Sequence, residues 1–237
     1  MEHLEIQVAV AKIGKYATSE SGDTVEMVER PHGGVSLVVV DGQRSGRSAK
    51  TISNLVARKS MSLLAEGVRD GAVARAAHDY LRTLRGGKVS AELHIVSVDL
   101  VSRTLVISRN SRCATFLRQG SEIEWLNEAS EAIGIHPKTK PSITEVALED
   151  GLTVAVFSDG ILGAGSRSGQ GMDVEAVIGE IDGDGATSAQ ILADGLLSTA
   201  LRLDKQRPQD DCTVLVVKLI ASSHNDDIRR LAASFPI

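Results

Sequence analysis

Hydrophobic positions recur along this chain with two different periods. Alternating or short continuous apolar runs, which are typical of half-buried and fully buried β-strands, predict strands over residues 4–13, 25–29, 35–40, 91–100, 104–108, 114–118, 122–126, 153–157 and 213–220. Apolar residues spaced three and four apart line one face of a helix, and they predict helices over residues 45–65, 70–84, 174–181 and from residue 187 onward. The stretch 128–149, which contains two prolines, is expected to be less regular.

Strands come in groups and helices come in pairs, so the order along the chain does not alternate as it does in a doubly wound parallel sheet. Such grouping favours antiparallel sheets in an α+β architecture. We find no internal repeat and expect one domain over residues 1–220, followed by a tail over 221–237 in which 228–237 is compatible with a short helix. Thr187 to Gln190 has the pattern of a capping box, which predicts that the last long helix begins at Thr187.

Composition narrows the class of protein. The longest apolar runs, such as 37–40 and 214–217, are far shorter than the ~18 residues of a membrane span, and the N-terminus lacks the features of a signal peptide. The two cysteines form no Cys-x-x-Cys pair, which fits a reducing compartment. We therefore expect a cytoplasmic protein with no membrane partner. A net charge of −5 and 3% aromatic residues argue against nucleic acid as a partner.

Three aspartates lie next to predicted strands. Asp41 and Asp159 each follow an apolar run, and Asp210 precedes the last strand. A carboxylate held by a rigid strand end is what a hard cation such as Mg²⁺ requires. The alternative is plain turn chemistry, because Asp-Gly is a common turn dipeptide and occurs seven times in the chain. Only the pairs at 41 and 159 follow a strand of four or more mostly apolar residues.

The segments around these aspartates resemble a known signature. In order along the chain they are Val38-Val39-Val40-Asp41-Gly42 with Ser45-Gly46, then Ile133-Gly134, Leu148-Glu149-Asp150-Gly151-Leu152, Phe157-Ser158-Asp159-Gly160-Ile161 and Asp210-Asp211-Cys212-Thr213. Together they are similar to the signature of the metal-dependent protein phosphatases, the protein phosphatase 2C-like (PPM) family. Ser21-Gly22-Asp23 resembles the acidic motif of its bacterial sporulation stage II E-like and stress-response subclass. The resemblance extends from about residue 5 to residue 220.

This resemblance implies a fold, a cofactor and a reaction. The fold would be a four-layer α-β-β-α sandwich of two antiparallel sheets flanked by helix pairs. The cofactor would be two ions of Mn²⁺ or Mg²⁺ that activate water for hydrolysis of phosphoserine or phosphothreonine. The substrate would be a phosphorylated regulatory protein, such as an anti-sigma-factor antagonist or a stress-complex subunit.

The same resemblance assigns ligand roles. Asp41 would bridge both ions, Gly42 through its carbonyl and Asp23 through its carboxylate would bind one of them, and Asp159 and Asp210 would bind the other. Asp211 occupies a position where many relatives have asparagine, and it is expected to lie beside the ligands. Clustered carboxylates repel one another, which agrees with a site that needs cations to be stable.

The chain departs from the family pattern at two positions. Arg44 replaces a usual glycine, and Ser19 stands where classical members have a phosphate-binding arginine; the nearest basic residue upstream is Lys15. A guanidinium can donate two hydrogen bonds to a phosphate. We therefore expect Arg44, with Arg47 as a second candidate, to help hold the substrate phosphate.

The competing interpretation is a catalytically inactive pseudophosphatase that serves as a protein-binding module. The retained aspartates argue against it, because loss of catalysis usually removes them. Other sites have less support. The segment 42–48 is one residue shorter than a phosphate-binding P-loop and has arginine in place of lysine. The glycines at 163, 165 and 169 are spaced one residue too far apart for a dinucleotide-binding fingerprint. The six histidines do not have the spacing of a zinc site.

Overall fold

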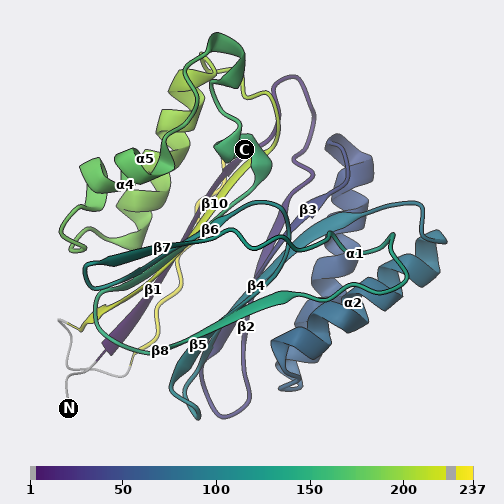
Figure 1. Ribbon diagram of the computed structural model, residues 1–237, viewed down its shortest axis with the longest axis horizontal. Coiled ribbons are helices and arrows are strands. Elements are labelled where there is room, and N and C mark those ends of the chain that lie inside the picture. Colours follow the sequence, from purple (N-terminus) through teal and green to yellow (C-terminus); the bar gives the residue numbers. More distant parts are fainter. Residues whose placement is uncertain (1–3, 223–227, 237) are drawn as a thin grey trace.

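Two antiparallel five-stranded sheets form the centre of the computed structural model, which describes residues 4–222 and 228–236 (Figure 1). The first sheet has the order β1-β10-β9-β6-β7, and the second has the order β2-β3-β4-β5-β8. The strands of the first sheet are β1 (Leu4–Ile13), β10 (Cys212–Ala221), β9 (Leu152–Phe157), β6 (Thr115–Gln119) and β7 (Glu122–Leu126). Those of the second are β2 (Thr24–Glu29), β3 (Val35–Gly42), β4 (Ala91–Asp99), β5 (Thr104–Asn110) and β8 (Ser142–Ala147).

A pair of helices covers the outer face of each sheet. Helices α1 (Gly46–Ala65) and α2 (Asp70–Arg85) pack on the second sheet, and α4 (Val174–Asp182) and α5 (Ala189–Leu203) pack on the first (Figure 1). A short helix α3 (Asp159–Leu162) and a 3₁₀ turn η1 (Ser166–Ser168) follow β9. The expected four-layer α-β-β-α sandwich is confirmed.

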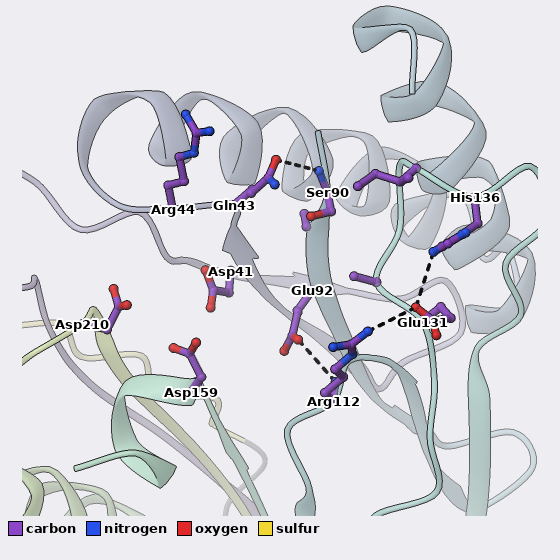
Figure 2. A pocket seen from close by; sticks show the side chains of 13 residues that line it. Asp41, Gln43, Arg44, Ser90, Glu92, Arg112, Glu131, His136, Asp159 and Asp210 are labelled. Atoms are coloured by element: carbon purple, nitrogen blue, oxygen red, sulfur yellow. Dashed lines mark hydrogen bonds and ion pairs between the residues drawn. The ribbon is translucent and has the colours of Figure 1, made fainter. Parts of the chain in front are cut away.

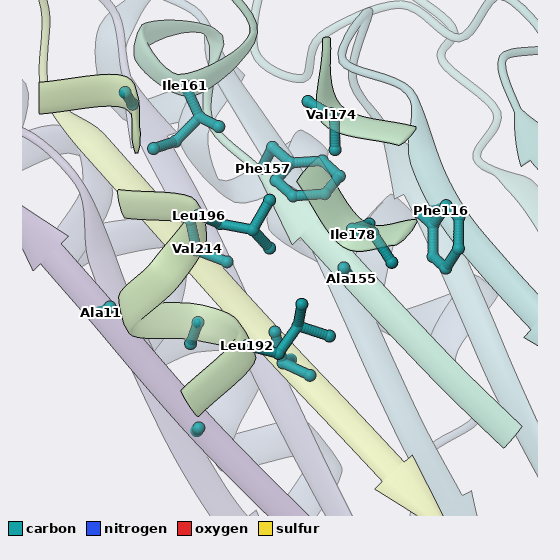
Figure 3. Close-up of a cluster of buried hydrophobic side chains, with 14 of the residues drawn as sticks. Ala11, Phe116, Ala155, Phe157, Ile161, Val174, Ile178, Leu192, Leu196 and Val214 are labelled. Carbon is teal, nitrogen blue, oxygen red and sulfur yellow. The ribbon is translucent and has the colours of Figure 1, made fainter. Parts of the chain in front are cut away.

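Three hydrophobic clusters hold the four layers together. One lies between the sheets and includes Leu37, Val96 and Leu215. The other two lie between each sheet and its helices, and Figure 3 shows the cluster beneath α4 and α5, where Phe157 and Leu196 pack. Strands such as β9 are buried on both faces, which explains why continuous apolar runs mark them in the sequence.

A buried ionic cluster ties the connection between α4 and α5 to the first sheet. Lys218 on β10 is 0% exposed and its Nζ donates hydrogen bonds to Asp182 Oδ1 at 2.9 Å and Oδ2 at 2.8 Å. Arg118 on β6 also pairs with the Asp182 carboxylate. Because the three charges are removed from water, each depends on its partners.

Three predictions made from the sequence require correction. Residues 142–147, expected to be irregular, form the edge strand β8. The last long helix begins at Ala189, because Ser188 is its N-cap and accepts a hydrogen bond from Ile191 N, so the capping box at Thr187 is wrong by one residue. Residues 228–236 form neither helix nor strand, so the short C-terminal helix is not found there; 223–227 and 237 lie outside the described residues. No helix in the described ranges is long and apolar enough to cross a bilayer.

Candidate metal centre

Three of the predicted aspartates line one cavity of about 350 Å³ at the end of the sandwich where the two sheets meet. Asp41 is the penultimate residue of β3 in the second sheet. Asp159 is the first residue of α3, which follows β9, and Asp210 lies in the loop before β10. Figure 2 shows the three carboxylates facing a common space. The two sheets therefore contribute to the same site.

Gly42 allows the end of β3 to lie against α1. A Cβ on Gly42 would come within 2.2 Å of the Ala49 carbonyl oxygen, a distance that no side chain tolerates. Gly160 is similarly close to a neighbour, since a Cβ there would lie 2.3 Å from the Asp211 carbonyl oxygen. The glycines that follow Asp41 and Asp159 thus position these aspartates through close backbone packing.

Burial and, after it, mutual repulsion determine the electrostatics of the site. Burial and the neighbouring carboxylates of Asp23, Asp159, Glu92 and Asp210 raise the pKa of Asp41 to about 9. Burial, together with the charges of Asp210 and Glu92, also raises the pKa of Asp159 above its usual range. The cluster binds protons when it has no cation, which is the behaviour expected of ligands for divalent ions.

Asp23 lies behind this cavity and does not line it. Its side chain is fully buried, its Oδ2 accepts a 2.5 Å hydrogen bond from Thr213 Oγ1, and its Oδ1 has no hydrogen-bond partner in the described structure. Burial raises the pKa of Asp23 to about 6. The ammonium groups of Lys12 and Lys50 both donate to the Asp23 backbone carbonyl, at 2.9 and 2.7 Å. An unpaired buried carboxylate oxygen near Asp41 fits a metal ligand.

Asp211 has a different environment from its neighbour Asp210. Its two carboxylate oxygens accept hydrogen bonds from the backbone N–H groups of Lys15 and Gly22, both at 2.9 Å. Its carbonyl accepts a hydrogen bond from Ser158 Oγ at 3.0 Å. Asp211 thus joins the segment before β2, the loop before β10 and the end of β9.

The donor set suits a hard cation, although the ligands do not yet surround one. Carboxylate and carbonyl oxygens from Asp23, Asp41, Gly42, Asp159 and Asp210 are the ligand types that Mg²⁺ and Mn²⁺ prefer. Within residues 4–222 and 228–236, no three His, Cys, Asp or Glu side chains already converge closely enough to hold one ion. The residues fit the expected metals in the chemistry of their donor atoms.

Neither expected arginine points at the aspartates. Arg44 lines the cavity, but it is exposed and its side chain extends away from Asp41 in Figure 2. Arg47 does not line the cavity and lies 3.6 Å from Glu20, measured from Nε to Oε1. The turn that carries Arg44 has a left-handed backbone there, with φ of 73°, which directs the side chain outward.

The sequence pattern missed four ionisable residues that line the same cavity. They are Glu92 on β4, Arg112 in the β5–β6 loop, and Glu131 and His136 in the segment before β8. Glu92 Oε2 accepts a 2.5 Å hydrogen bond from Ser111 Oγ. The guanidinium of Arg112 and the imidazole of His136 lie 3.8 and 3.6 Å from Glu131 Oε2 (Figure 2). Arg112 therefore places a cation in the lining of the same cavity as Asp41, Asp159 and Asp210.

Several solved structures with this architecture are phosphatase domains. The PP2C phosphatase domain of SpoIIE from Bacillus subtilis has a TM-score of 0.78 and 20% identity, covering 93% of this chain and 65% of that chain. The SiaA-PP2C domain of Pseudomonas aeruginosa has a TM-score of 0.73 and 22% identity, covering 89% and 84%. The catalytic domain of the serine/threonine phosphatase PstP, solved with two manganese ions, has a TM-score of 0.71 and 15% identity, covering 92% and 100%.

These likenesses establish the fold, and the family comes from a sequence comparison. No curated protein gives a significant match to the chain. The family model for stage II sporulation protein E matches residues 31–220, a range that begins just before β3 and includes Asp41, Asp159 and Asp210. Since this match spans most of the chain, the protein belongs to the stage II sporulation protein E family, whose fold is that of the PP2C-type (PPM) phosphatases.

Proposed function

We propose that this chain is a metal-dependent serine/threonine phosphoprotein phosphatase. A single observation carries the proposal: carboxylates from both sheets, those of Asp41, Asp159 and Asp210, line one cavity, where burial and the neighbouring carboxylates raise the pKa of Asp41 and of Asp159. We further propose that residues 1–220 form the catalytic domain, with 221–237 as a tail. The substrate is a phosphorylated regulatory protein of the anti-sigma-factor-antagonist or stress-complex type, and the reaction takes place in the cytoplasm.

The proposed ligand set uses the strand ends described above. Asp41, Gly42 and Asp23 would hold one Mn²⁺ or Mg²⁺ ion, and Asp159 and Asp210, together with Asp41, would hold a second. The two manganese ions in the PstP domain support this number of ions for the fold. When bound, such a pair activates water as the nucleophile and neutralises charge on the transferring phosphoryl group.

The chain's own residues prepare the cavity for that chemistry. Arg112 is 79% exposed on its side chain, so its guanidinium is free to turn from Glu131 and donate two hydrogen bonds to phosphate oxygens. Arg44 adds positive charge at the mouth of the cavity. The Gln43 side chain accepts a hydrogen bond from Ser90 N at 3.3 Å, which fixes the segment after Asp41 against the start of β4.

Hydrolysis of para-nitrophenyl phosphate and of a phosphoserine peptide tests the proposal. We expect activity with added Mn²⁺ or Mg²⁺, none in excess EDTA, and loss of most activity in Asp159→Asn with the fold intact by circular dichroism. Asp150→Asn, which removes an exposed carboxylate from a turn, is the matched control. Undiminished hydrolysis in EDTA would contradict the two-metal mechanism, whereas absence of both hydrolysis and calorimetric Mn²⁺ binding would favour the pseudophosphatase.

A further inference from the structure

Helices α1 and α2 carry a concentration of positive charge that the rest of the protein lacks. Residues 43–88 contain ten lysines and arginines against three acidic residues, a net charge of +7. The chain as a whole has a net charge of −5, so the remaining residues carry −12. One of the three acids, Asp70, is buried and lies 3.7 Å from Arg30. Only Glu66 and Asp79 expose negative charge within this segment.

A hollow on the outer face of the two helices collects part of this charge. It has a volume of about 550 Å³, and we call it the α1–α2 groove. The residues that line it are Thr51, Asn54, Leu55, Arg58, Lys59, Ser62 and Tyr80, and none of them is acidic. Arg58 is exposed and has no ion-pair partner among the described residues, while Lys59 Nζ lies 5.8 Å from the centre of the Tyr80 ring.

Helix α1 links the groove to the candidate metal centre. Helix α1 begins at Gly46, directly after the cavity residues Asp41 to Arg44. Residues 47, 51, 54, 58 and 62 follow at helical spacing, so they form one stripe along the helix. From Gly46 to Arg58 the helix rises about 18 Å at 1.5 Å per residue. A segment that leaves the cavity along this stripe therefore reaches the groove.

We propose that the α1–α2 groove is the docking site for an acidic segment of the phosphoprotein substrate, six to ten residues from the phosphorylated side chain. This inference rests on the proposed phosphatase function. The spacing follows from geometry, because an extended chain spans about 3.3 Å per residue and about 18 Å corresponds to at least five or six residues. Arg58 and Lys59 supply the charge, and the Leu55 and Tyr80 side chains accommodate an apolar residue within the acidic segment.

Two synthetic phosphoserine peptides of equal length test the proposal. One peptide carries four glutamates at positions six to ten residues from the phosphoserine, and the other carries glutamines at the same positions. Each peptide is made in two versions, with these residues either before or after the phosphoserine. We expect the acidic peptide to have a kcat/KM about tenfold higher in low salt, with the difference lost in high salt as the charges are screened. Arg58→Glu/Lys59→Glu should remove this advantage and leave hydrolysis of para-nitrophenyl phosphate unchanged.

Arg103→Glu/Arg202→Glu is the control, because it makes the same change in charge at exposed positions outside residues 43–88. A binding measurement separates docking from catalysis: fluorescence anisotropy with the unphosphorylated acidic peptide should show binding that is lost in the groove variant and kept in the control. Peptide binding without any hydrolysis would retain the docking site and reject the phosphatase function.

Four results would overturn the docking proposal. Equal kcat/KM values for the two peptides, or equal losses in the groove variant and the control, would show that the groove does not select acidic substrates. Salt-sensitive binding to phosphatidylserine vesicles in preference to the peptide would assign the face to an anionic lipid surface. Self-association of the wild type that the groove variant abolishes in sedimentation would assign it to the acidic surface of a second copy.

Discussion

Replacing Asp41 by asparagine should stabilise the protein in chelator and destabilise it, relative to wild type, in manganese. The Asp41 carboxyl has a pKa of about 9 in the folded protein, against about 3.9 in an unfolded chain. At pH 7 folding therefore requires the group to take up a proton. The difference between 3.9 and 7, at about 1.4 kcal/mol per pH unit, gives an upper bound of about 4 kcal/mol, which solvent screening lowers to about 1–3 kcal/mol.

Asparagine removes this cost because it carries no ionisable proton. For a domain of this size, 2 kcal/mol corresponds to a rise in Tm of about 4–8 °C. Since burial raises the folded pKa of this acid, wild-type stability falls as the pH rises from about 4, the unfolded pKa, to about 9. The advantage of Asp41→Asn should thus be absent below pH 4, grow through that window and level off above it.

Saturating Mn²⁺ should reverse the order. A ligand at 100 times its Kd stabilises the folded state by about 2.7 kcal/mol, and Asp41→Asn lacks the bridging carboxylate needed to gain it. Differential scanning calorimetry in EDTA and in Mn²⁺, at pH 5 and pH 8, measures both effects, with Asp150→Asn as the control that changes neither. A lower Tm for Asp41→Asn in EDTA at pH 8 would refute the repulsion argument, and equal Mn²⁺ stabilisation of both proteins would refute the ligand role.

Four further substitutions test other parts of the structure. Arg112→Ala should lower kcat/KM on a phosphopeptide about tenfold, because it removes a charge-assisted hydrogen bond worth roughly 1.5–3 kcal/mol, a value that solvent exposure reduces. Arg44→Ala should cause a smaller loss. Equal rates for Arg112→Ala and wild type would leave the metals as the phosphate anchor. Gly42→Ala should destabilise the fold by about 1–3 kcal/mol in urea titrations and abolish activity, because its Cβ would meet a carbonyl oxygen of α1 at 2.2 Å. Lys218→Met should cost about 3–5 kcal/mol, because it leaves the buried Asp182 short of a partner, and an unchanged Tm would contradict this.

The sequence predicts the elements whose side chains are buried, and it fails where burial gives no signal. Strand β9 is buried throughout and is evident as an apolar run. Strand β8 has no fully buried residue, because it is at the edge of its sheet and alternates between half-buried and exposed positions. Residues 142–147 form a strand because they pair with β5, and no local sequence pattern indicates it.

The same distinction applies to the site. Asp41 and Asp159 are predictable because each follows an apolar strand, and their chemistry is that of a strand end. Arg112 and His136 reach the cavity from irregular segments, whose course depends on long-range packing. The Asn110-Ser111-Arg112 turn between two predicted strands was the available signal for Arg112, but a turn between strands does not reveal at which end of the sandwich it lies.

The division of the candidate ligands between two sheets has a consequence for regulation. No strand ladder joins the sheets within the described residues; they meet through apolar packing and through contacts such as that of Thr213 with Asp23. A small slip of one sheet against the other therefore changes the separation of Asp41 from Asp159 and Asp210 without breaking a hydrogen bond of either strand ladder. If these aspartates bind ions as we propose, ion affinity and the alignment of the sheets are thermodynamically linked. A protein that favours one alignment would then tighten or weaken ion binding, and the ions would alter that protein's affinity by the same factor.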